Sequence, residues 1–503
     1  MVGTGLAIVV GVRALPAADA RVHRHAVGTI DVAIRDDNDA PIPARLTFLP
    51  IGDTPRVQFT TVDIGKDENG GVAAFDRVFV LRGEAEIRIA AGTYDIWVSH
   101  GMEWDTTRER VTVKAGGSIE VTAKLHHVID TPGWISGDFH VHAAPSMDSR
   151  VPLRDRVHQF VADGVDLIVS TDHNVVADYG PVITELGVGD LLASATGDEI
   201  TSLPWGHFGA FPLPLDDTEV GHGAPATGKH SAKQIFADVR TKAPHALIDV
   251  HHPRLENGGI GYFHLAGLDE KTGRAKKSGF SFDFDAIEVL NGYQDPDRKT
   301  LDRVIGDWVA FLDAGLHVAA TGNSDSHHMT FNLGGFPRNY VVMPDGPLAQ
   351  LDVQKVAAQV KAGCSYLTTG PILDITIGGR HIGQTVTLRS GDVPIKLVVR
   401  AAPWITVTSV TVLGPGGAVL AQRAVPPATT IIRFDDTITV HLARDGYVIV
   451  RVDGDRPMAP NIGDESSFKV YPFALANPVW VDVDGDGKSS PVAPYTLAEQ
   501  PGE

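Results

Sequence analysis

Two kinds of hydrophobic pattern alternate along the chain. Residues 27–130 consist of short stretches in which apolar and polar positions alternate, separated by turns that contain glycine and proline. Examples are Thr29–Ile34, Tyr94–Val98 and Ile119–Ala123. Alternation with period two is typical of β-strands with one buried face. We therefore expect a β-sandwich accessory domain over residues 27–130.

The pattern changes over residues 134–372, where amphipathic stretches precede continuous apolar runs. The amphipathic stretches predict helices at Pro152–Gly164, Ser231–Ala243 and Pro296–Ala314. The apolar runs that follow them predict strands at 165–171, 246–250 and 316–320. Strands that are each preceded by a helix predict an α/β fold, either a barrel or a doubly wound sheet. Both architectures place functional sites at the carboxyl ends of the strands.

Alternation returns after residue 372, for example in Ile395–Arg400 and Tyr447–Val452, which predicts a C-terminal β-sandwich domain and tail over residues 373–503. The whole chain has 503 residues, more than one ordinary hydrophobic core supports. Hydrophobic residues make up 43% and charged residues 21%, as in folded proteins rather than disordered ones.

Charge and cysteine content narrow the functional classes. The formal net charge of −19 repels polyanions, so we expect no nucleic-acid partner. The single cysteine, Cys364, excludes an intrachain disulfide and a thiolate metal cluster. A metal ion would therefore be held by histidine and carboxylate side chains, and the chain has 21 histidines.

Residues 1–20 have the features of an export signal. The apolar run over residues 1–12 is too short to cross a bilayer, and Ala18 and Ala20 fit a signal-peptidase site. We expect cleavage after Ala20 and a periplasmic or secreted protein. No later segment is long and apolar enough to predict a membrane span.

Metal-binding side chains follow the predicted central strands of residues 134–372. In a strand, residues i and i+2 face the same side, so His140 and His142 can hold one cation together. Asp325 and His327 have the same spacing. Imidazole and carboxylate ligands without thiolate suit Zn, Mn or Fe, and a carboxylate such as Glu199 can bridge two ions.

The order of these motifs resembles the PHP (polymerase and histidinol phosphatase) superfamily of metallohydrolases. The motifs are His140-Val-His142, Thr171-Asp-His173-Asn, Gly197-Asp-Glu199-Ile, His252-Pro253 and Asp325-Ser-His327. Within it, the stretches 323–327 and 336–340 look most like the CehA/McbA branch, which includes carbaryl hydrolases. Residues 91–97 resemble part of a carboxypeptidase-regulatory-like domain.

The resemblance implies a distorted (β/α)7 barrel with two or three divalent ions at its C-terminal mouth. Carried over residue by residue, it implies these ligands: His140, His142, Asp148, His173, Glu199, His207, His252, Asp325 and His327. Asp172 would orient His173 or a metal-bound water, and His251 would pack behind the ligands. Arg254 and Arg338 could contact a phosphate group.

These features predict a metal-dependent hydrolase that uses metal-activated hydroxide. The positive charge of the ions favours a small anionic ester, so a phosphoesterase is the leading hypothesis. The branch resemblance favours a carbamate or amide hydrolase. A third hypothesis, from another class, is a non-catalytic metal-containing protein that binds a polymer. Separately, Asp482, Asp484 and Asp486 have the spacing that begins a calcium loop, although position twelve is Ala493.

Overall fold

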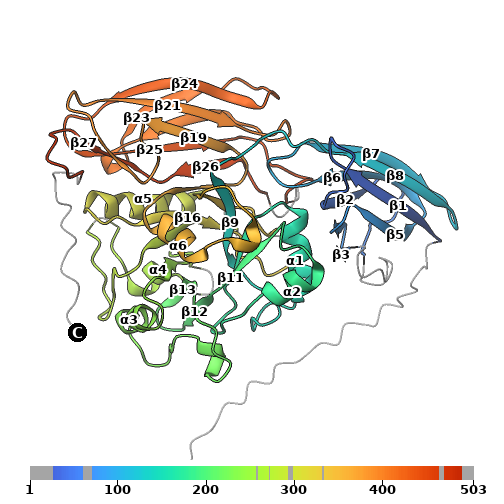
Figure 1. The fold of residues 1–503 in the computed structure, drawn as a ribbon, viewed down its shortest axis with the longest axis horizontal. Helices are drawn as coiled ribbons and strands as arrows, with labels where there is room; N and C mark the ends of the chain where they lie inside the picture. Colours follow the sequence, from blue (N-terminus) through green and yellow to red (C-terminus); the bar gives the residue numbers. More distant parts are fainter. Residues whose placement is uncertain are drawn as a thin grey trace, which may run out of the picture.

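The structure is a computed structural model. It describes residues 26–59, 71–256, 259–270, 272–292, 298–330, 333–463 and 469–489. The predicted export signal at residues 1–20 lies outside the described residues and stays a prediction. Figure 1 shows an N-terminal β region, a central region that contains the helices, and a C-terminal β region. No helix in the described part of the chain is long and apolar enough to cross a membrane.

The N-terminal region consists of two sheets around one core. One sheet has the order β5-β1-β8 and the other β3-β4-β2-β6-β7. Ile30, Val32 and Ile34 alternate with more exposed residues along β1 and are buried in the core between the sheets. The strands are β1 (Val27–Arg35), β2 (Ala44–Pro50), β3 (Val72–Ala74), β4 (Arg77–Val80), β5 (Glu84–Ala90), β6 (Gly92–Ser99), β7 (Thr106–Val113) and β8 (Ser118–Lys124).

The central region alternates strands with helices. Its strands are β9 (Trp134–Val141), β10 (Leu167–Ser170), β11 (Ala193–Thr196), β12 (Asp198–Ser202), β13 (Gly206–Phe211), β14 (Leu247–Val250), β15 (Ala286–Asn291), β16 (Ala319–Asn323), β17 (Arg338–Val342) and β18 (Ser365–Thr368). Its helices are α1 (Leu153–Ala162), α2 (Gly180–Leu186), α3 (Ala232–Lys242), α4 (Tyr262–Ala266), α5 (Lys299–Asp313) and α6 (Val353–Lys361), with short 3₁₀ turns η1 (Val220–Gly223) and η2 (Leu348–Gln350). Helices α1, α3 and α5 occupy the predicted stretches.

The central strands are divided between two sheets. One begins β11-β10-β9-β17-β18, and the other is β12-β13-β14-β15-β16. Isolated bridges link them at both sides, between His173 and Glu199 and between Val141 and Ser326. Strands β12, β13, β17 and β18 run antiparallel to neighbours, so the pattern is not a simple succession of parallel β/α units. The mixed α/β class is confirmed, whereas closure into a (β/α)7 barrel stays a prediction.

The C-terminal region continues the central sheet, because β26 pairs with β18. One continuous sheet therefore crosses the predicted domain boundary at residue 372. Strands β19, β21 and β24 form a separate sheet. The elements are β19 (Ile372–Ile377), β20 (Thr385–Thr387), β21 (Asp392–Arg400), β22 (Ser409–Leu413), η3 (Pro415–Gly417), β23 (Val419–Ala424), β24 (Ile432–His441), β25 (Gly446–Asp453), β26 (Phe473–Ala476) and β27 (Val479–Asp482).

A buried ion pair joins the three regions. Arg45 of β2 and Asp163 at the end of α1 are both fully buried and form a salt bridge. The Arg45 guanidinium also donates to the backbone oxygen of Asn461 in the C-terminal region, at 2.6 Å.

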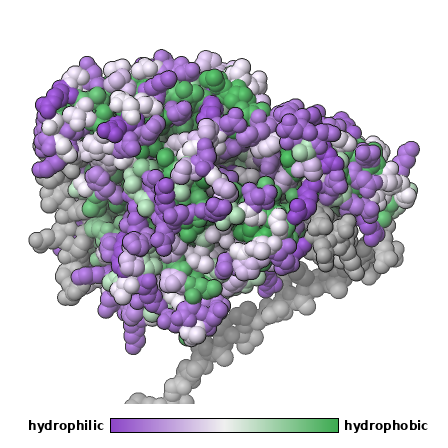
Figure 2. Space-filling model, viewed as in Figure 1, coloured by the Kyte–Doolittle hydropathy of each residue, from purple (hydrophilic) through white to green (hydrophobic). Residues whose placement is uncertain are grey.

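The face of the molecule shown in Figure 2 is largely hydrophilic, with groups of hydrophobic residues among the hydrophilic ones.

Replacing Arg45 should destabilise this junction. In Arg45→Ala the Asp163 carboxylate stays buried without its partner, which costs roughly 3–5 kcal/mol in free energy of unfolding. Urea unfolding followed by circular dichroism measures the change. Arg88→Ala, at an exposed position of β5, is the matched control and should leave the midpoint unchanged. Equal midpoints for the two variants would contradict the assigned role of the ion pair.

Candidate metal centre

All nine predicted ligand positions meet at one end of the central strands. His140 and His142 belong to the end of β9 and the residues after it, and both are fully buried. Glu199 lies on β12 and His207 on β13. The remaining positions lie in the loops that follow strands, at Asp148, His173, His252, Asp325 and His327. Seven of these residues also line one cavity of about 470 Å³: Asp148, His173, Glu199, His207, His252, Asp325 and His327.

The Glu199 carboxylate is the centre of the cluster. It is 1% exposed, and six imidazole rings surround it. The distances from Glu199 Oε1 are 2.9 Å to His251 Nδ1, 3.0 Å to His140 Nε2, 3.1 Å to His207 Nδ1 and 3.3 Å to His252 Nε2, and those from Oε2 are 2.9 Å to His173 Nδ1 and 3.3 Å to His142 Nε2. A carboxylate with rings on both oxygen atoms has the arrangement of a bridge between two ions.

Two further carboxylates extend the cluster. Asp325 Oδ1 lies 3.2 Å from His140 Nε2 and 3.4 Å from His142 Nε2. At the outer side, Asp148 Oδ2 lies 3.1 Å from His327 Nε2, and the Asp148 side chain is 47% exposed. The cluster therefore runs from a buried interior to a solvent-facing carboxylate.

The donor atoms fit divalent metal ions. His140 Nε2 and His142 Nε2 are buried and have no hydrogen-bond partner, although carboxylate oxygens lie within 3.4 Å of both. A buried ring nitrogen close to carboxylates but outside hydrogen-bond geometry is suited to bind a shared cation. Groups of donors that lie within 4.8 Å of one another are His140, Glu199 and His251; His140, His142 and Asp325; His173, Glu199 and His207; and His142, Asp148, His173 and His327.

The electrostatics of the cluster favour added positive charge. Burial alone raises the pKa of Glu199, but His140, His207 and His173 outweigh it and hold the pKa well below its usual value. Burial also raises the pKa of Asp325, but the nearby His140, His142 and His327 outweigh burial and hold this pKa well below its usual value. Ionised carboxylates in a dry interior need nearby cations. Divalent ions would supply that charge, with the imidazole rings neutral.

Backbone strain is concentrated at the site. Asn174, His252 and Asp325 have positive φ values of 53°, 27° and 52°. Each such residue costs on the order of 1–3 kcal/mol and persists only when its surroundings hold it. His252 is held by its backbone N–H, which donates to Glu288 Oε2 at 2.7 Å. Asp325 is held by its side chain, because Asn291 Nδ2 donates to Asp325 Oδ2 at 3.1 Å.

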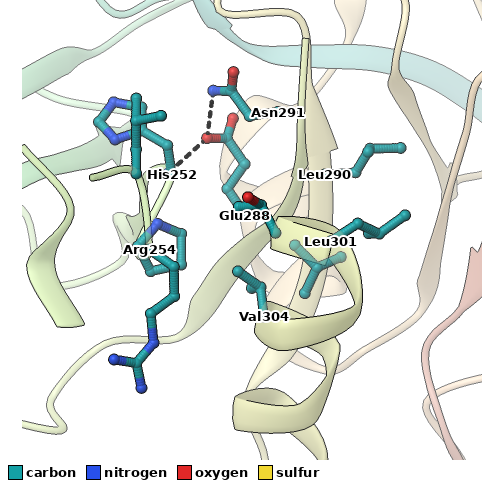
Figure 3. Close-up of a pocket in the computed structure, with 11 residues that line it drawn as sticks. His252, Arg254, Glu288, Leu290, Asn291, Leu301 and Val304 are labelled. Atoms are coloured by element: carbon teal, nitrogen blue, oxygen red, sulfur yellow. Dashed lines mark hydrogen bonds between the residues drawn. The ribbon is translucent and has the colours of Figure 1, made fainter. Parts of the chain in front are cut away.

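Glu288 on β15 is a functional residue that the sequence analysis missed. Its carboxylate is 1% exposed and lies 3.0 Å from His140 Nδ1, on the far side of that ring from Glu199. It also accepts hydrogen bonds from the backbone of His252 and from Asn291 at 2.9 Å, and Figure 3 shows both. A carboxylate that binds the second nitrogen of a metal-binding histidine fixes the orientation of the ring. A charged residue inside the otherwise apolar run Ala286–Leu290 was the available signal.

His251 lies closer to the carboxylate centre than its predicted packing role requires. Its ring stacks on His140 with centroids 3.6 Å apart, and its Nε2 is buried without a hydrogen-bond partner. Gly209 leaves the space for this ring, because a Cβ at Gly209 would lie 2.1 Å from His251 Nε2. His251 is therefore a candidate ligand alongside His252.

Three predicted roles need correction. Arg254 and Arg338 are 3% and 1% exposed and do not contact the cavity centre. Arg254 forms a two-pronged salt bridge with Asp307, with both contacts at 2.7 Å. All three nitrogens of the Arg338 guanidinium donate to backbone oxygens, so neither arginine is available for a substrate phosphate. Asp172 accepts from Ala143 N–H at 2.7 Å and from the Tyr179 hydroxyl at 3.1 Å, and does not orient His173. Its alternative role toward a metal-bound water stays a prediction.

The predicted calcium loop brings four carboxylates together. One oxygen from each of Asp445, Asp482, Asp484 and Asp486 lies within 4.8 Å of the others. Asp445, on the loop before β25, was not part of the sequence prediction. Asp482 already accepts backbone N–H groups of Gly485 and Gly487 in the same turn.

Two solved structures show a distant similarity to this chain. No family model and no curated protein matches the sequence. A two-domain protein from Bacteroides vulgatus that contains a predicted PHP-like metal-dependent phosphoesterase is 17% identical, with 69% of this chain and 95% of that chain covered and a TM-score of 0.33. A lesion-specific endonuclease from Pyrococcus furiosus is 15% identical, with 45% and 56% covered and a TM-score of 0.30. At these TM-scores the site geometry alone supports a functional conclusion.

Removing the charge of Glu288 should weaken metal binding. In Glu288→Gln an amide replaces the carboxylate that faces both His140 Nδ1 and the His252 N–H. Loss of such a partner costs about 10- to 100-fold in metal affinity. Competition with a chromogenic chelator measures the affinity, and Glu120→Gln, exposed on β8, is the control. Unchanged affinity in Glu288→Gln would show that Glu288 does not orient a ligand.

Proposed function

We propose that this protein is a metal-dependent hydrolase of the PHP superfamily that acts on small phosphate esters. The observation that supports it most strongly is the Glu199 carboxylate with six imidazole rings around both of its oxygen atoms. The order of the motifs along the chain agrees with this family, as does the absence of cysteine from the cluster. Zn, Mn and Fe are the ions that suit these ligands, in two or three sites.

Different residues of the chain would have different roles in such a site. Bound divalent ions would lower the pKa of water to about 7 and stabilise negative charge on the substrate. Glu199, Asp325 and Asp148 offset half of the charge of three divalent ions, which leaves the site attractive to an anion. Glu288 holds the His140 ring in place, and the half-exposed Asp148 faces the solvent side where a substrate enters.

One observation favours the second hypothesis, a carbamate or amide hydrolase. Among the described residues that line the cavity there is no lysine or arginine, so a neutral carbonyl substrate would also be accommodated. The third hypothesis, a non-catalytic polymer-binding protein, fits the geometry less well. Structural metal sites are usually closed by four ligands, whereas these ligands line an open cavity of about 470 Å³.

Metal removal should abolish hydrolysis. Asp325→Ala and His140→Ala each remove a ligand that touches two others, so both should lose bound metal together with activity toward phosphate esters. Elemental analysis and a phosphoester assay, with carbamates in parallel, measure the two effects. Chelation should abolish turnover in the unmutated protein, and Mn²⁺ or Zn²⁺ should restore it.

Asp435→Ala, exposed on β24, is the matched control and should keep metal and activity. Circular dichroism should show folded β regions in all variants. Unchanged turnover in both ligand variants would remove the assigned site. Bound metal without turnover of any ester, carbamate or amide would favour the non-catalytic hypothesis.

Calcium at Asp482, Asp484 and Asp486 remains a separate proposal. If the ion binds there, calcium should raise the melting temperature of the full-length protein, because a ligand that binds only the folded state stabilises it. Asp484→Asn should remove the increase without changing hydrolysis. An identical calcium response in the variant would contradict binding at this loop.

A further inference from the structure

The cavity beside the metal centre has two chemically different sides. One side consists of the imidazole and carboxylate groups of the cluster, with His328 beside them. The other side is formed by Leu255 and Ile260, which are the apolar residues among the described residues that line the cavity. We call these two residues the apolar wall. A substrate in the cavity therefore meets metal-binding groups on one side and hydrocarbon on the other.

The apolar wall is held against the central sheet. The Leu255 N–H donates to the His252 backbone oxygen at 3.0 Å, and the Gly261 N–H donates to the Leu255 oxygen at 3.1 Å. The backbone of Ile260 lies directly over Gly206 at the start of β13, where a Cβ would lie 2.3 Å from the Ile260 oxygen. Gly206 has φ of +92°, a conformation that favours glycine. The wall is therefore part of the built site.

The apolar surface continues past His252. A second cavity of about 40 Å³ shares His252 and Leu255 with the first. Leu290, Leu301 and Val304 line one part of this second cavity, as Figure 3 shows. Its lining also contains the polar residues Arg254, Glu288, Asn291 and Thr300.

Three positively charged side chains of the surrounding segments have partners outside the cavity. Arg254 is paired with Asp307, and Arg338 donates to three backbone oxygens. Lys277 donates to the Pro204 backbone oxygen and lies over the Trp205 ring.

We propose that the cavity selects phosphodiesters over phosphomonoesters, with the second organic arm of the diester on the apolar wall. This inference rests on the proposed hydrolase function and names its substrate class. A phosphomonoester carries two negative charges on three terminal oxygens, whereas a diester carries one charge and a second organic group. Dianion recognition normally uses charge-assisted hydrogen bonds from arginine or lysine. Leu255 and Ile260 offer hydrocarbon instead, against which the second organic group of a diester can pack.

A pair of non-hydrolysable ligands tests the inference without turnover. Phenylphosphonate, at a pH where it is a dianion, and its monoethyl ester, a monoanion, are titrated calorimetrically into the full-length, metal-loaded protein. The monoethyl ester imitates a phosphodiester because it is a monoanion with two organic groups. It should bind at least about tenfold more tightly than phenylphosphonate. In parallel, ethyl p-nitrophenyl phosphate should be hydrolysed with a higher kcat/KM than p-nitrophenyl phosphate. Tighter binding of the dianion would overturn the inference.

A charge placed on the wall should reverse the preference. Leu255→Arg should tighten dianion binding relative to the monoanion by about tenfold. Leu203→Arg is the control, because Leu203 is 93% exposed and outside the cavity lining, so it adds the same charge without direct contact. Ile260→Arg repeats the test from the other wall residue if Leu255→Arg lowers the melting temperature. An unchanged preference in folded wall variants would contradict the role of the wall.

The outcomes separate the two levels of the proposal. Turnover of both phosphate esters with a preference for the monoester contradicts only the selectivity. A metal-loaded protein that hydrolyses a carbamate, and neither phosphate ester, contradicts the phosphoesterase function and the inference that rests on it.

Discussion

The central site depends on one carboxylate, Glu199, buried among imidazole rings. A fully buried carboxylate is costly unless positive charge lies beside it. Here three carboxylates and seven histidines within and around one cavity leave buried ring nitrogens without hydrogen-bond partners. Bound divalent ions would satisfy both needs at once, because they would neutralise the carboxylates and bind the free lone pairs of the ring nitrogens. The architecture around the site is best understood as the means of holding these groups together.

The fold supports this arrangement through elements that are far apart in the sequence. Two sheets meet at the bridges between His173 and Glu199 and between Val141 and Ser326, which lie within the ligand cluster itself. Pairing of β18 with β26 continues the central sheet into the C-terminal region, and Arg45 ties the N-terminal region to both. The accessory β regions therefore stabilise the central sheets from outside the site.

Much of the site could be predicted from sequence, because a strand places residues i and i+2 on one face and parallel strands end together. That logic paired His140 with His142, and the structure places both within 3.4 Å of Asp325. The amphipathic pattern predicted helices where α1, α3 and α5 occur. It could not predict the direction of side chains in loops. Arg254 adjoins a ligand in sequence, yet its guanidinium points to Asp307. Glu288 was missed because a single acid in an apolar strand reveals its partners only after the strands are paired.

The central claim is that the carboxylate and imidazole groups around Glu199 hold divalent metal ions. X-ray absorption at the metal edge of the purified protein, combined with an anomalous difference map from its crystals, tests it most directly. The account predicts metal ions that have only nitrogen and oxygen ligands and that lie within the cluster of imidazole and carboxylate groups around Glu199. A map with no ion within reach of Glu199, in protein that elemental analysis shows to be metal-loaded, would contradict it.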